Sequence, residues 1–265
     1  QTSVKELDSP EQAQEHASKQ AAGKLKKGYQ ELLANLTNLT SLDLSGEALQ
    51  NVDSLANLTN LTSLNLHYCD ALKNIDGLAS LTNLTSLDLS SCHALQNVDS
   101  LTNLTKLTSL NLRSCDALQN VDGLTNCTNL TSLVLWECNA LQNVDGLANL
   151  TKLTSLDLGC CKAALQNIDG LANCTNLTNL DLGGCHALQN VDGLANLTKL
   201  TSLDLSACFD LQNVDGLANL TNLTSLKFSD NMFGTNLQPK PSRLTMTTRK
   251  QVVAYQERIK KSMKK

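Results

Sequence analysis

The chain of 265 residues is 41% hydrophobic but only 3% aromatic, so it lacks the large rings that fill the core of most globular domains of this length. No apolar run approaches the ~18 residues that span a bilayer, and no apolar signal-peptide segment follows Gln1. Residues 36–230 hold seven Lys/Arg and nineteen Asp/Glu, whereas residues 231–265 hold nine and one. The acidic middle argues against a grip on nucleic acid and favours a protein partner with a basic or mixed surface.

The first predicted element is a helix over residues 10–34. Ser9 stands at its N-cap, Pro10 at the first helical position, and Gln12 is placed to close a capping box. Terminal units of a repeat array need a polar outer cover to stay soluble. We therefore expect residues 1–35 to form an N-terminal helical cap for the repeats that follow.

A repeated unit fills the middle of the chain. Each copy contains two core residues separated by one position, and the copies follow one another at steps of 22 to 24 residues. The nine pairs are Leu42/Leu44, Leu64/Leu66, Leu87/Leu89, Leu110/Leu112, Leu133/Leu135, Leu156/Leu158, Leu180/Leu182, Leu203/Leu205 and Leu226/Phe228. This period and this spacing of leucines are typical of leucine-rich repeats. We therefore predict an α/β repeat solenoid over residues 36–236, a leucine-rich repeat arc of about nine repeats with a parallel β-sheet on the concave face and helical caps at both ends.

The stretch after each strand carries apolar residues at a spacing of three, as at Leu95, Val98, Leu101 and Leu104. This spacing suits 3₁₀ helices or extended turns, so we predict short segments on the convex side and a gently curved solenoid. The Asp of each Val-Asp-Gly-Leu sequence is expected to cap the short helical turn.

Nine of the ten cysteines occupy core positions of the repeat. Seven of them stand directly after the strand: Cys69, Cys92, Cys115, Cys138, Cys161, Cys185 and Cys208. Cys127 and Cys174 replace a core leucine, and Cys160 is the one expected to face outward. We interpret the set as reduced, structural thiols whose S–H groups bond to nearby backbone. Zinc is not expected, because no Cys-x-x-Cys pair completes a set of four ligands.

A family resemblance lies in the units L-T-N-L-T-S-L-D-L and N-V-D-G-L-A-N-L-T. They resemble the internalin-type leucine-rich repeats of bacterial surface and secreted proteins, over about residues 36–236. One departure is systematic: Cys replaces the family's Asn ladder, as in the cysteine-containing repeats of F-box proteins and some bacterial effectors. The resemblance implies a protein-binding module with a concave recognition face.

The end of the chain is predicted to leave the repeat pattern. Pro239 and Pro241 are expected to end the solenoid, so that residues 237–265 form a basic tail. Residues 243–265 are typical of an amphipathic helix. Its apolar stripe consists of Val252, Tyr255, Ile259 and Met263. Three interpretations stay open: a C-terminal cap or solvated helix, docking to a partner or adjoining domain, and contact with an acidic membrane or nucleic acid.

The sequence contains no recognisable catalytic constellation. It has no glycine-rich phosphate loop after a strand, no His-Glu-x-x-His and no Gly-x-Ser-x-Gly. The Asp residues recur at the same positions of each repeat, which indicates a structural role. His93 and His186 share one surface position without an evident role. We therefore expect no enzyme activity from the solenoid, no cofactor and no metal.

The candidate site comes from outward-facing strand positions that break the repeat. Small or acidic residues fill most of these positions, but repeats two to five carry larger ones, including the single Trp of the chain. Trp, Tyr and Arg are enriched at binding hot spots. The predicted partner-binding residues are His67, Tyr68, Asp88, Asn111, Arg113, Val134, Trp136, Glu137 and Asp157. On one side, Gly159 and Gly183 are expected to leave room for a bulky partner.

Two other functions stay open at this point. The solenoid is alternatively the substrate-targeting domain of a larger effector enzyme. The Thr columns, such as Thr59/Thr62 and Thr82/Thr85, form a regular array that is able to order water or ice, although the same pattern supports the turn into the strand in ordinary repeats. Asn-x-Ser/Thr sequences occur in nearly every unit, and a eukaryotic secretory protein with so many of them would be heavily glycosylated. They therefore favour a bacterial protein, whether secreted, surface-exposed or cytosolic, or a cytosolic protein from another source. We expect a monomer with no nucleic acid bound at the solenoid.

Overall fold

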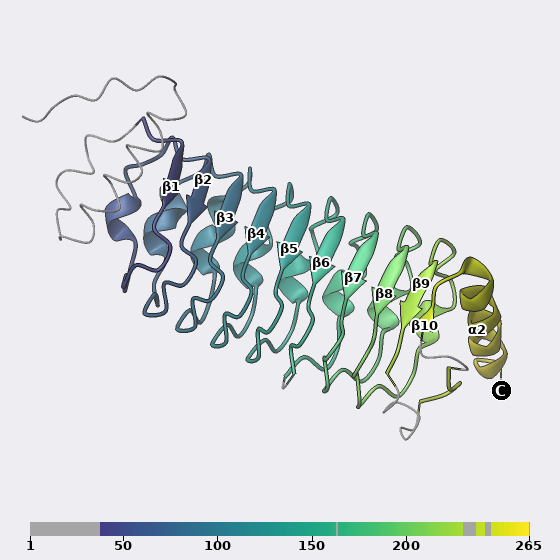
Figure 1. Ribbon diagram of the computed structural model, residues 1–265. Coiled ribbons are helices and arrows are strands. Elements are labelled where there is room, and N and C mark those ends of the chain that lie inside the picture. Colours follow the sequence, from purple (N-terminus) through teal and green to yellow (C-terminus); the bar gives the residue numbers. More distant parts are fainter. Residues whose placement is uncertain (1–37, 163, 230–236, 242–244, 265) are drawn as a thin grey trace, which may run out of the picture.

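The computed structural model describes residues 38–162, 164–229, 237–241 and 245–264. These residues form one elongated solenoid in which short strands and 3₁₀ turns alternate, as Figure 1 shows. The leucine-rich repeat architecture predicted from the sequence is confirmed. The expected N-terminal cap over residues 1–35 lies outside the described residues.

Within the described residues, a single sheet runs along the solenoid. Nine parallel strands lie in sequence order and each pairs with the next, with core leucine opposite core leucine. The strands are β1 (Ser41–Asp43), β2 (Ser63–Asn65), β3 (Ser86–Asp88), β4 (Ser109–Asn111), β5 (Ser132–Val134), β6 (Ser155–Asp157), β7 (Asn179–Asp181), β8 (Ser202–Asp204) and β9 (Ser225–Lys227). A tenth strand, β10 (Thr245–Met246), adds antiparallel to β9. The outward side of this sheet is called the sheet face below.

The opposite side of the solenoid is built from 3₁₀ helices, as the three-residue spacing predicts. They are η2 (Asp53–Leu55), η3 (Asp76–Ser80), η4 (Asp99–Asn103), η5 (Asp122–Leu124), η6 (Asp145–Leu147), η7 (Asp169–Leu171), η8 (Asp192–Leu194) and η9 (Asp215–Leu217). Successive turns stack closely. A Cβ added at Gly146 would lie 2.1 Å from the carbonyl oxygen of Val121, so a glycine at this position permits the close approach of neighbouring repeats.

The predicted capping role of the Asp in Val-Asp-Gly-Leu is wrong. In η6 the N-cap is Val144, whose side chain cannot accept a hydrogen bond. The backbone N–H of Asp145 instead donates to the side-chain oxygen of Asn143 at 3.1 Å, and the other turns repeat this arrangement. The Asn two positions before the Asp forms an Asx turn that satisfies the backbone N–H of the Asp itself. The N–H groups that a capping Asp would serve, those of Leu147 and Ala148, donate to the backbone carbonyls of Val144 and Asp145.

The cysteine ladder is confirmed as part of the core. All ten cysteines are free thiols, and nine of them are buried while Cys160 is partly exposed. The Cys92 thiol donates to the Leu66 carbonyl of the preceding repeat at 3.3 Å, and the six other ladder thiols make the equivalent bond. Burial raises the pKa of Cys115 to about 12. The Cys115 thiol therefore stays protonated at neutral pH. The ladder thiols act as small apolar groups with one donor each.

The C-terminal end of the solenoid is covered by α2 (Arg249–Ser262), which lies against η9 and β9. Val252, Tyr255 and Ile259 are fully buried there, as the apolar stripe predicts. Met263 was wrongly assigned to the stripe, because the helix ends at Ser262 and the Met263 side chain is 55% exposed. This packing favours the interpretation of the tail as a C-terminal cap.

Gln256 is a buried polar residue of α2 that the sequence did not single out. Its amide donates to the carbonyls of Leu217 and Leu220 at 2.8 and 3.0 Å, so it satisfies backbone groups at the open end of the last repeat. Among the residues that the structure describes, none of the helices has the length and apolarity needed to cross a bilayer.

Candidate functional site

In all of the nine parallel strands except β5 and β9, the last strand residue is an Asp or Asn whose side-chain oxygen accepts a backbone N–H from the turn that follows. Oδ1 of Asp88 accepts the backbone N–H of Ser90 at 2.8 Å, and Oδ1 of Asp157 accepts that of Gly159 at 2.9 Å. Val134 is an exception, since its side chain has no acceptor. Asp and Asn in this column therefore stabilise the turn through one side-chain oxygen, and the second polar atom is the one that makes other contacts, as when Oδ2 of Asp88 accepts the Asn111 amide.

The residue five positions after the start of each of the strands β1 to β8 adopts a left-handed backbone conformation. Tyr68 and Glu137 have φ values of 59° and 62°, and the backbone N–H of Glu137 donates to the Gly159 carbonyl of the next repeat at 2.8 Å. Non-glycine residues rarely adopt this conformation. Gly46 and Gly184 occupy the same column with positive φ, which was the sequence signal for it.

Arg113 and Trp136 form a stacked pair on adjacent strands. The guanidinium carbon of Arg113 lies 4.2 Å from the centroid of the Trp136 ring, a cation–π geometry. The ring also covers Gly159, where an added Cβ would come within 2.8 Å of Trp136 Cδ1. Trp136 is therefore only partly exposed, and the space expected above Gly159 is filled by this ring, which corrects the prediction of open room there.

The stack leaves the Arg113 guanidinium available. Arg113 is exposed, and the described residues offer its side chain no hydrogen-bond or ion-pair partner. Stacking restricts the side chain without using any of its N–H donors. Such a group is prepared to bind a carboxylate through two parallel hydrogen bonds.

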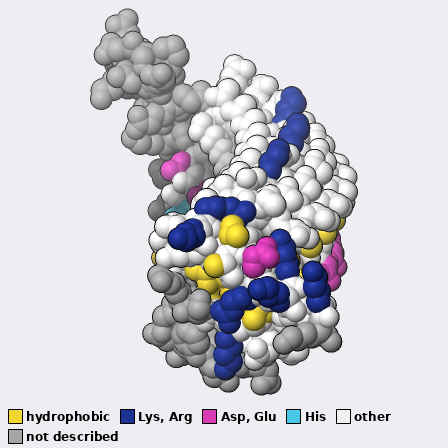
Figure 2. Space-filling view, turned by 90° about the vertical axis from the view of Figure 1, so that its right-hand side faces the viewer, with side chains coloured by type: hydrophobic (Ala, Val, Ile, Leu, Met, Phe, Trp, Pro, Cys, Tyr) yellow, Lys and Arg dark blue, Asp and Glu magenta, His cyan; other side chains and the backbone are white. Residues whose placement is uncertain are grey.

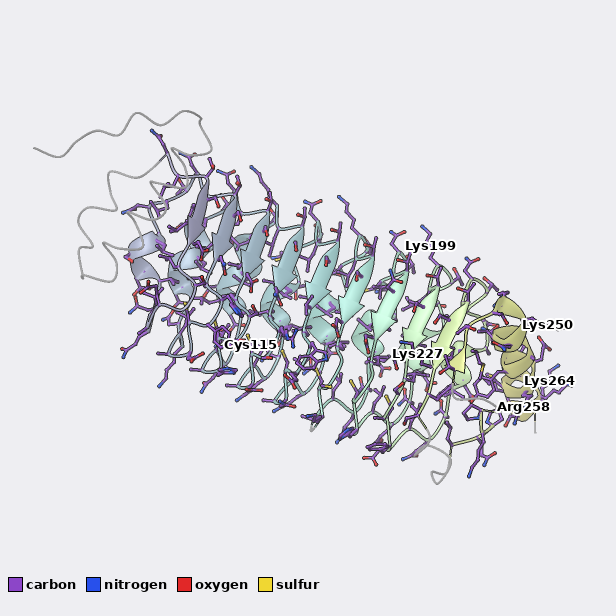
Figure 3. All side chains as sticks on the ribbon, in the orientation of Figure 1. Cys115, Lys199, Lys227, Lys250, Arg258 and Lys264 are labelled. Atoms are coloured by element: carbon purple, nitrogen blue, oxygen red, sulfur yellow. The ribbon has the colours of Figure 1, made fainter. Side chains whose placement is uncertain are left out.

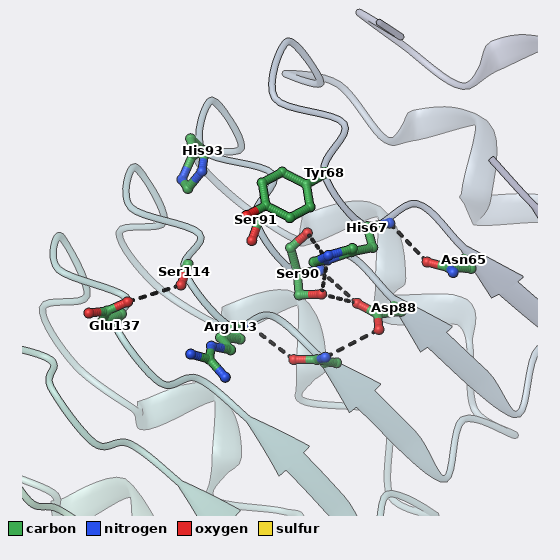
Figure 4. A pocket seen from close by; sticks show the side chains of 11 residues that line it. Asn65, His67, Tyr68, Asp88, Ser90, Ser91, His93, Arg113, Ser114 and Glu137 are labelled. Atoms are coloured by element: carbon green, nitrogen blue, oxygen red, sulfur yellow. Dashed lines mark hydrogen bonds between the residues drawn. The ribbon is translucent and has the colours of Figure 1, made fainter. Parts of the chain in front are cut away.

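A hollow of about 600 Å³ lies beside Arg113 on the sheet face. Figure 4 shows the side chains that surround it. Its walls are formed by Asn65, His67, Tyr68, Asp88, Ser90, Ser91, His93, Asn111, Arg113, Ser114 and Glu137. Six of the nine predicted binding residues are among these. Val134, Trp136 and Asp157 are not, although Trp136 supports the Arg113 wall from outside the hollow.

The carboxylates of the hollow are already hydrogen-bonded. Asp88 accepts the Ser90 hydroxyl on Oδ1 and the Asn111 amide on Oδ2, the latter at 3.2 Å. Glu137 accepts the Ser114 hydroxyl at 3.2 Å. By contrast, the Arg113 guanidinium has no such partner among the described residues. The unused hydrogen-bonding capacity of the hollow is therefore mainly that of a cationic donor.

His67 belongs to the same network but is not set up as a catalytic base. Its Nδ1 lies 2.7 Å from the Ser90 hydroxyl oxygen, and that hydroxyl donates its proton to Asp88. Nδ1 must then donate to Ser90 and cannot take its proton. Ser90 is also only 3% exposed. The His67–Ser90–Asp88 chain fixes the shape of the hollow and does not activate Ser90 as a nucleophile.

His93 is a member of the site that the sequence treated as a plain surface residue. Its Nδ1 lies 2.9 Å from Asp116, and its Nε2 lies 3.9 Å from Asp70. The three residues occupy the same repeat position, 23 residues apart, so they stack on neighbouring turns. That shared position was the available signal. The groups of His, Cys, Asp and Glu within the described residues do not form a cluster that would hold a metal ion.

A second, acidic hollow of about 250 Å³ lies further along the sheet face, over β6 to β9. Asp157, Asp181 and Asp204 line it, and Lys227 pairs with Asp204 at 3.2 Å. Burial raises the pKa of Asp181 above its usual range, and the neighbouring carboxylates of Asp204 and Asp157 add to this. The sheet face thus presents a free cation over β4 and clustered anions over β6 and β7.

Comparisons with known proteins agree with this architecture. Residues 98–167 match Zer-1-like leucine-rich repeats, residues 27–122 the leucine-rich repeat domain of the endo-beta-N-acetylglucosaminidase EndoS, and residues 136–235 the BspA-type leucine-rich repeat region. No curated protein sequence matches the chain significantly.

Two solved structures show the likeness in three dimensions. Internalin C2 from Listeria monocytogenes is 27% identical, with a TM-score of 0.59 over 80% of this chain and 92% of that one. The leucine-rich repeat domain of the type III effector XCV3220 (XopL) is 20% identical, with a TM-score of 0.59 over 89% and 99%, and supports the fold alone. The chain is an internalin-like leucine-rich repeat protein with a cysteine ladder.

Proposed function

We propose that this chain is a non-catalytic protein–protein interaction module, and that it binds its partner through the sheet face of repeats two to five. Leucine-rich repeat domains generally bind protein partners, and the fold typically serves as an interaction scaffold. Repeated stacking gives such proteins an extended surface for recognition. The choice of this part of the surface rests on the side chains described above.

The observation that carries the proposal is the Arg113–Trp136 stack. A guanidinium held over an indole loses little conformational entropy when it binds, because its position is already restricted. Trp and Arg are also the residue types most enriched at interface hot spots. We therefore place the centre of the interface at this pair, with His67, Tyr68 and Glu137 around it.

The charges of the sheet face define the partner's chemistry. Arg113 has unused donors, so the partner is expected to place a carboxylate over β4. Within the described part of the chain, neither Asp157 nor Asp181 forms an ion pair, because Lys227 pairs with Asp204 instead. A basic side chain of the partner is therefore expected over β6 and β7. A partner segment of mixed charge that lies along the sheet satisfies both requirements.

The alternative of ice binding through the Thr columns has little structural support. The Thr85 hydroxyl donates to the carbonyl of Thr62 at 3.0 Å, and the same bond recurs along this column. These hydroxyls thus support the turn into the strand.

A targeting role within a larger effector enzyme is compatible with the proposal, because the same face would select the substrate.

A capture experiment with matched variants tests the proposal. Arg113→Ala/Trp136→Ala removes one cation and one aromatic ring from the site, and Lys199→Ala/Phe209→Ala removes the same types from repeats seven and eight. Loss of a hot-spot pair is expected to weaken binding by on the order of 30-fold or more. A partner retained by wild type and by the control, but lost by the folded site variant, supports the site; equal retention by all three proteins rejects it.

A further inference from the structure

The outer side of α2 carries a cluster of positively charged side chains. This basic face consists of Lys250, Arg258, Lys260, Lys261 and Lys264. Figure 2 shows Lys and Arg side chains gathered on this end of the molecule, and Figure 3 shows Lys250, Arg258 and Lys264 on the outer side of α2. Glu257 is the one acid of the helix, and it pairs with Lys260 at 3.3 Å. Four cations are therefore left without an acidic partner among the described residues.

The inner side of α2 is fully used by the fold. Val252, Tyr255 and Ile259 are buried against the last repeat, so the helix cannot turn its apolar side outward without uncovering the core. Any contact through the outer side of α2 must therefore be mainly electrostatic. Met263, with 55% of its side chain exposed, is the large apolar residue that this end offers beside the cations.

Most of the groups that would read a nucleic acid are engaged on this helix, and the exposed guanidinium of Arg258 is the one that remains. Gln256 uses its amide on the Leu217 and Leu220 carbonyls, and Arg249 donates to the Leu223 carbonyl at 3.2 Å. Tyr255 is buried and its hydroxyl donates to the Pro239 carbonyl, so it offers no ring for stacking on bases. Base recognition needs such exposed amides, guanidinium forks and rings.

A folded acidic protein is also a poor match for this surface. Stable protein interfaces have an apolar core with aromatic anchors and place their charges at the rim. The basic face has the reverse composition, with lysines at its centre and no exposed aromatic ring among its described residues. A broad, planar surface of negative charge requires neither shape complementarity nor anchors, and fits this composition better.

We propose that the basic face of α2 is a contact surface for an anionic lipid bilayer. The lysine side chains meet the lipid headgroups, and Met263 reaches the headgroup boundary. The flank of the solenoid repels the same surface, because residues 36–230 hold nineteen acidic and seven basic residues. The molecule therefore contacts the bilayer with its C-terminal end, and the sheet face of repeats two to five is left free to bind a partner.

The strength expected of this contact is modest. Each lysine near an anionic bilayer contributes about a fivefold gain in binding, and the attraction falls off within a Debye length. A polybasic patch of five cations without an inserted chain gives reversible association that salt dissociates. Neutralising three of the lysines is expected to lower binding by on the order of 100-fold.

Sedimentation of the full chain with lipid vesicles tests the proposal. One vesicle contains phosphatidylcholine alone and the other contains phosphatidylcholine with phosphatidylserine. The test variant is Lys250→Gln/Lys261→Gln/Lys264→Gln. The control is Lys106→Gln/Lys152→Gln/Lys199→Gln, which removes the same charge from lysines that bond to Asn side chains along the repeats.

The expected result is binding of wild type and control to the phosphatidylserine vesicles, its loss in the α2 variant, and its loss for all proteins at high salt. Three outcomes overturn the proposal. Wild type fails to sediment with phosphatidylserine vesicles, or binds both vesicles equally, or the control loses as much binding as the α2 variant. Tighter binding to a DNA duplex than to the vesicles at equal phosphate concentration also overturns it and makes nucleic acid the ligand.

Discussion

Repeats two to five and repeats six to eight have the same backbone structure but carry different side chains on the sheet face. Both regions pair leucine with leucine across the parallel strands, and both end their strands with an acceptor two residues before the turn. In the first region the next outward position holds Arg113 and Trp136, whereas in the second it holds Gly159 and Gly183. The comparison distinguishes the repeated residues, which determine the fold, from the non-repeated side chains, which form the proposed binding surface.

If the core packs equally well along the solenoid, truncating a core leucine should lower the free energy of unfolding by the same amount in both regions. Leu133 in β5 and Leu203 in β8 are each 1% exposed. Leu133→Ala and Leu203→Ala should each lower the free energy of unfolding by about 3 kcal/mol, as measured by urea denaturation. A difference above about 2 kcal/mol between the two variants would show that the regions differ in packing as well as in surface.

The turn acceptors offer a finer test, because Val134 lacks one. Asp157→Ala should destabilise the chain by about 1 kcal/mol, since the N–H of Gly159 loses its partner, while Asp157→Asn keeps the acceptor and should be neutral. Val134→Asp should supply the missing acceptor and stabilise the chain by about 0.5 kcal/mol. Thermal unfolding measures all three, and an Asp157→Asn as harmful as Asp157→Ala would contradict the account.

The smallest effect concerns the acidic hollow and depends on pH. Burial, with Asp204 and Asp157 nearby, raises the pKa of Asp181 above its ordinary value of 3.8. The folded state thus holds this proton more tightly, so the contribution to stability is complete below that value and is lost as the pH rises through the raised pKa.

Replacing Asp181 by Asn removes the charge and keeps an acceptor for the Gly183 N–H. The carboxyl group of Asp181 is partly shielded, but the residue as a whole is exposed and its charge is screened by solvent. The variant should therefore gain no more than about 0.5 kcal/mol at neutral pH. At about pH 3.5 the gain should vanish, since the wild-type carboxyl is then largely protonated. An equal gain in urea titrations at both pH values would assign the effect to something other than this titration.

The sequence alone was sufficient to predict the structural features that repeat with a fixed period. Strand positions, the burial of the cysteines and the 3₁₀ turns all follow from the spacing of Leu, Cys and Val, because each repeat meets the same neighbours. The role of Asp145 was misassigned for a local reason: an Asn and an Asp two positions apart are both able to serve the turn, and only the backbone decides between them.

The site could be predicted only in part. Arg113 and Trp136 stand out because they break the repeat, but their stacking and the covering of Gly159 depend on side-chain rotamers. The place of His93 between Asp70 and Asp116 depends on contacts between neighbouring turns rather than on any motif. Similarly, the apolar stripe of α2 was visible in the sequence, but its end before Met263 was not.

The fluorescence of Trp136 tests the central claim most directly, because it is the single tryptophan of the chain and lies at the proposed centre of the interface. The partner captured by wild type would be titrated, as a tryptophan-free form, into the full chain. Binding through repeats two to five predicts a blue shift of the emission and protection from acrylamide quenching at saturation. Saturating binding with unchanged emission and unchanged quenching would contradict the account and place the interface elsewhere on the solenoid.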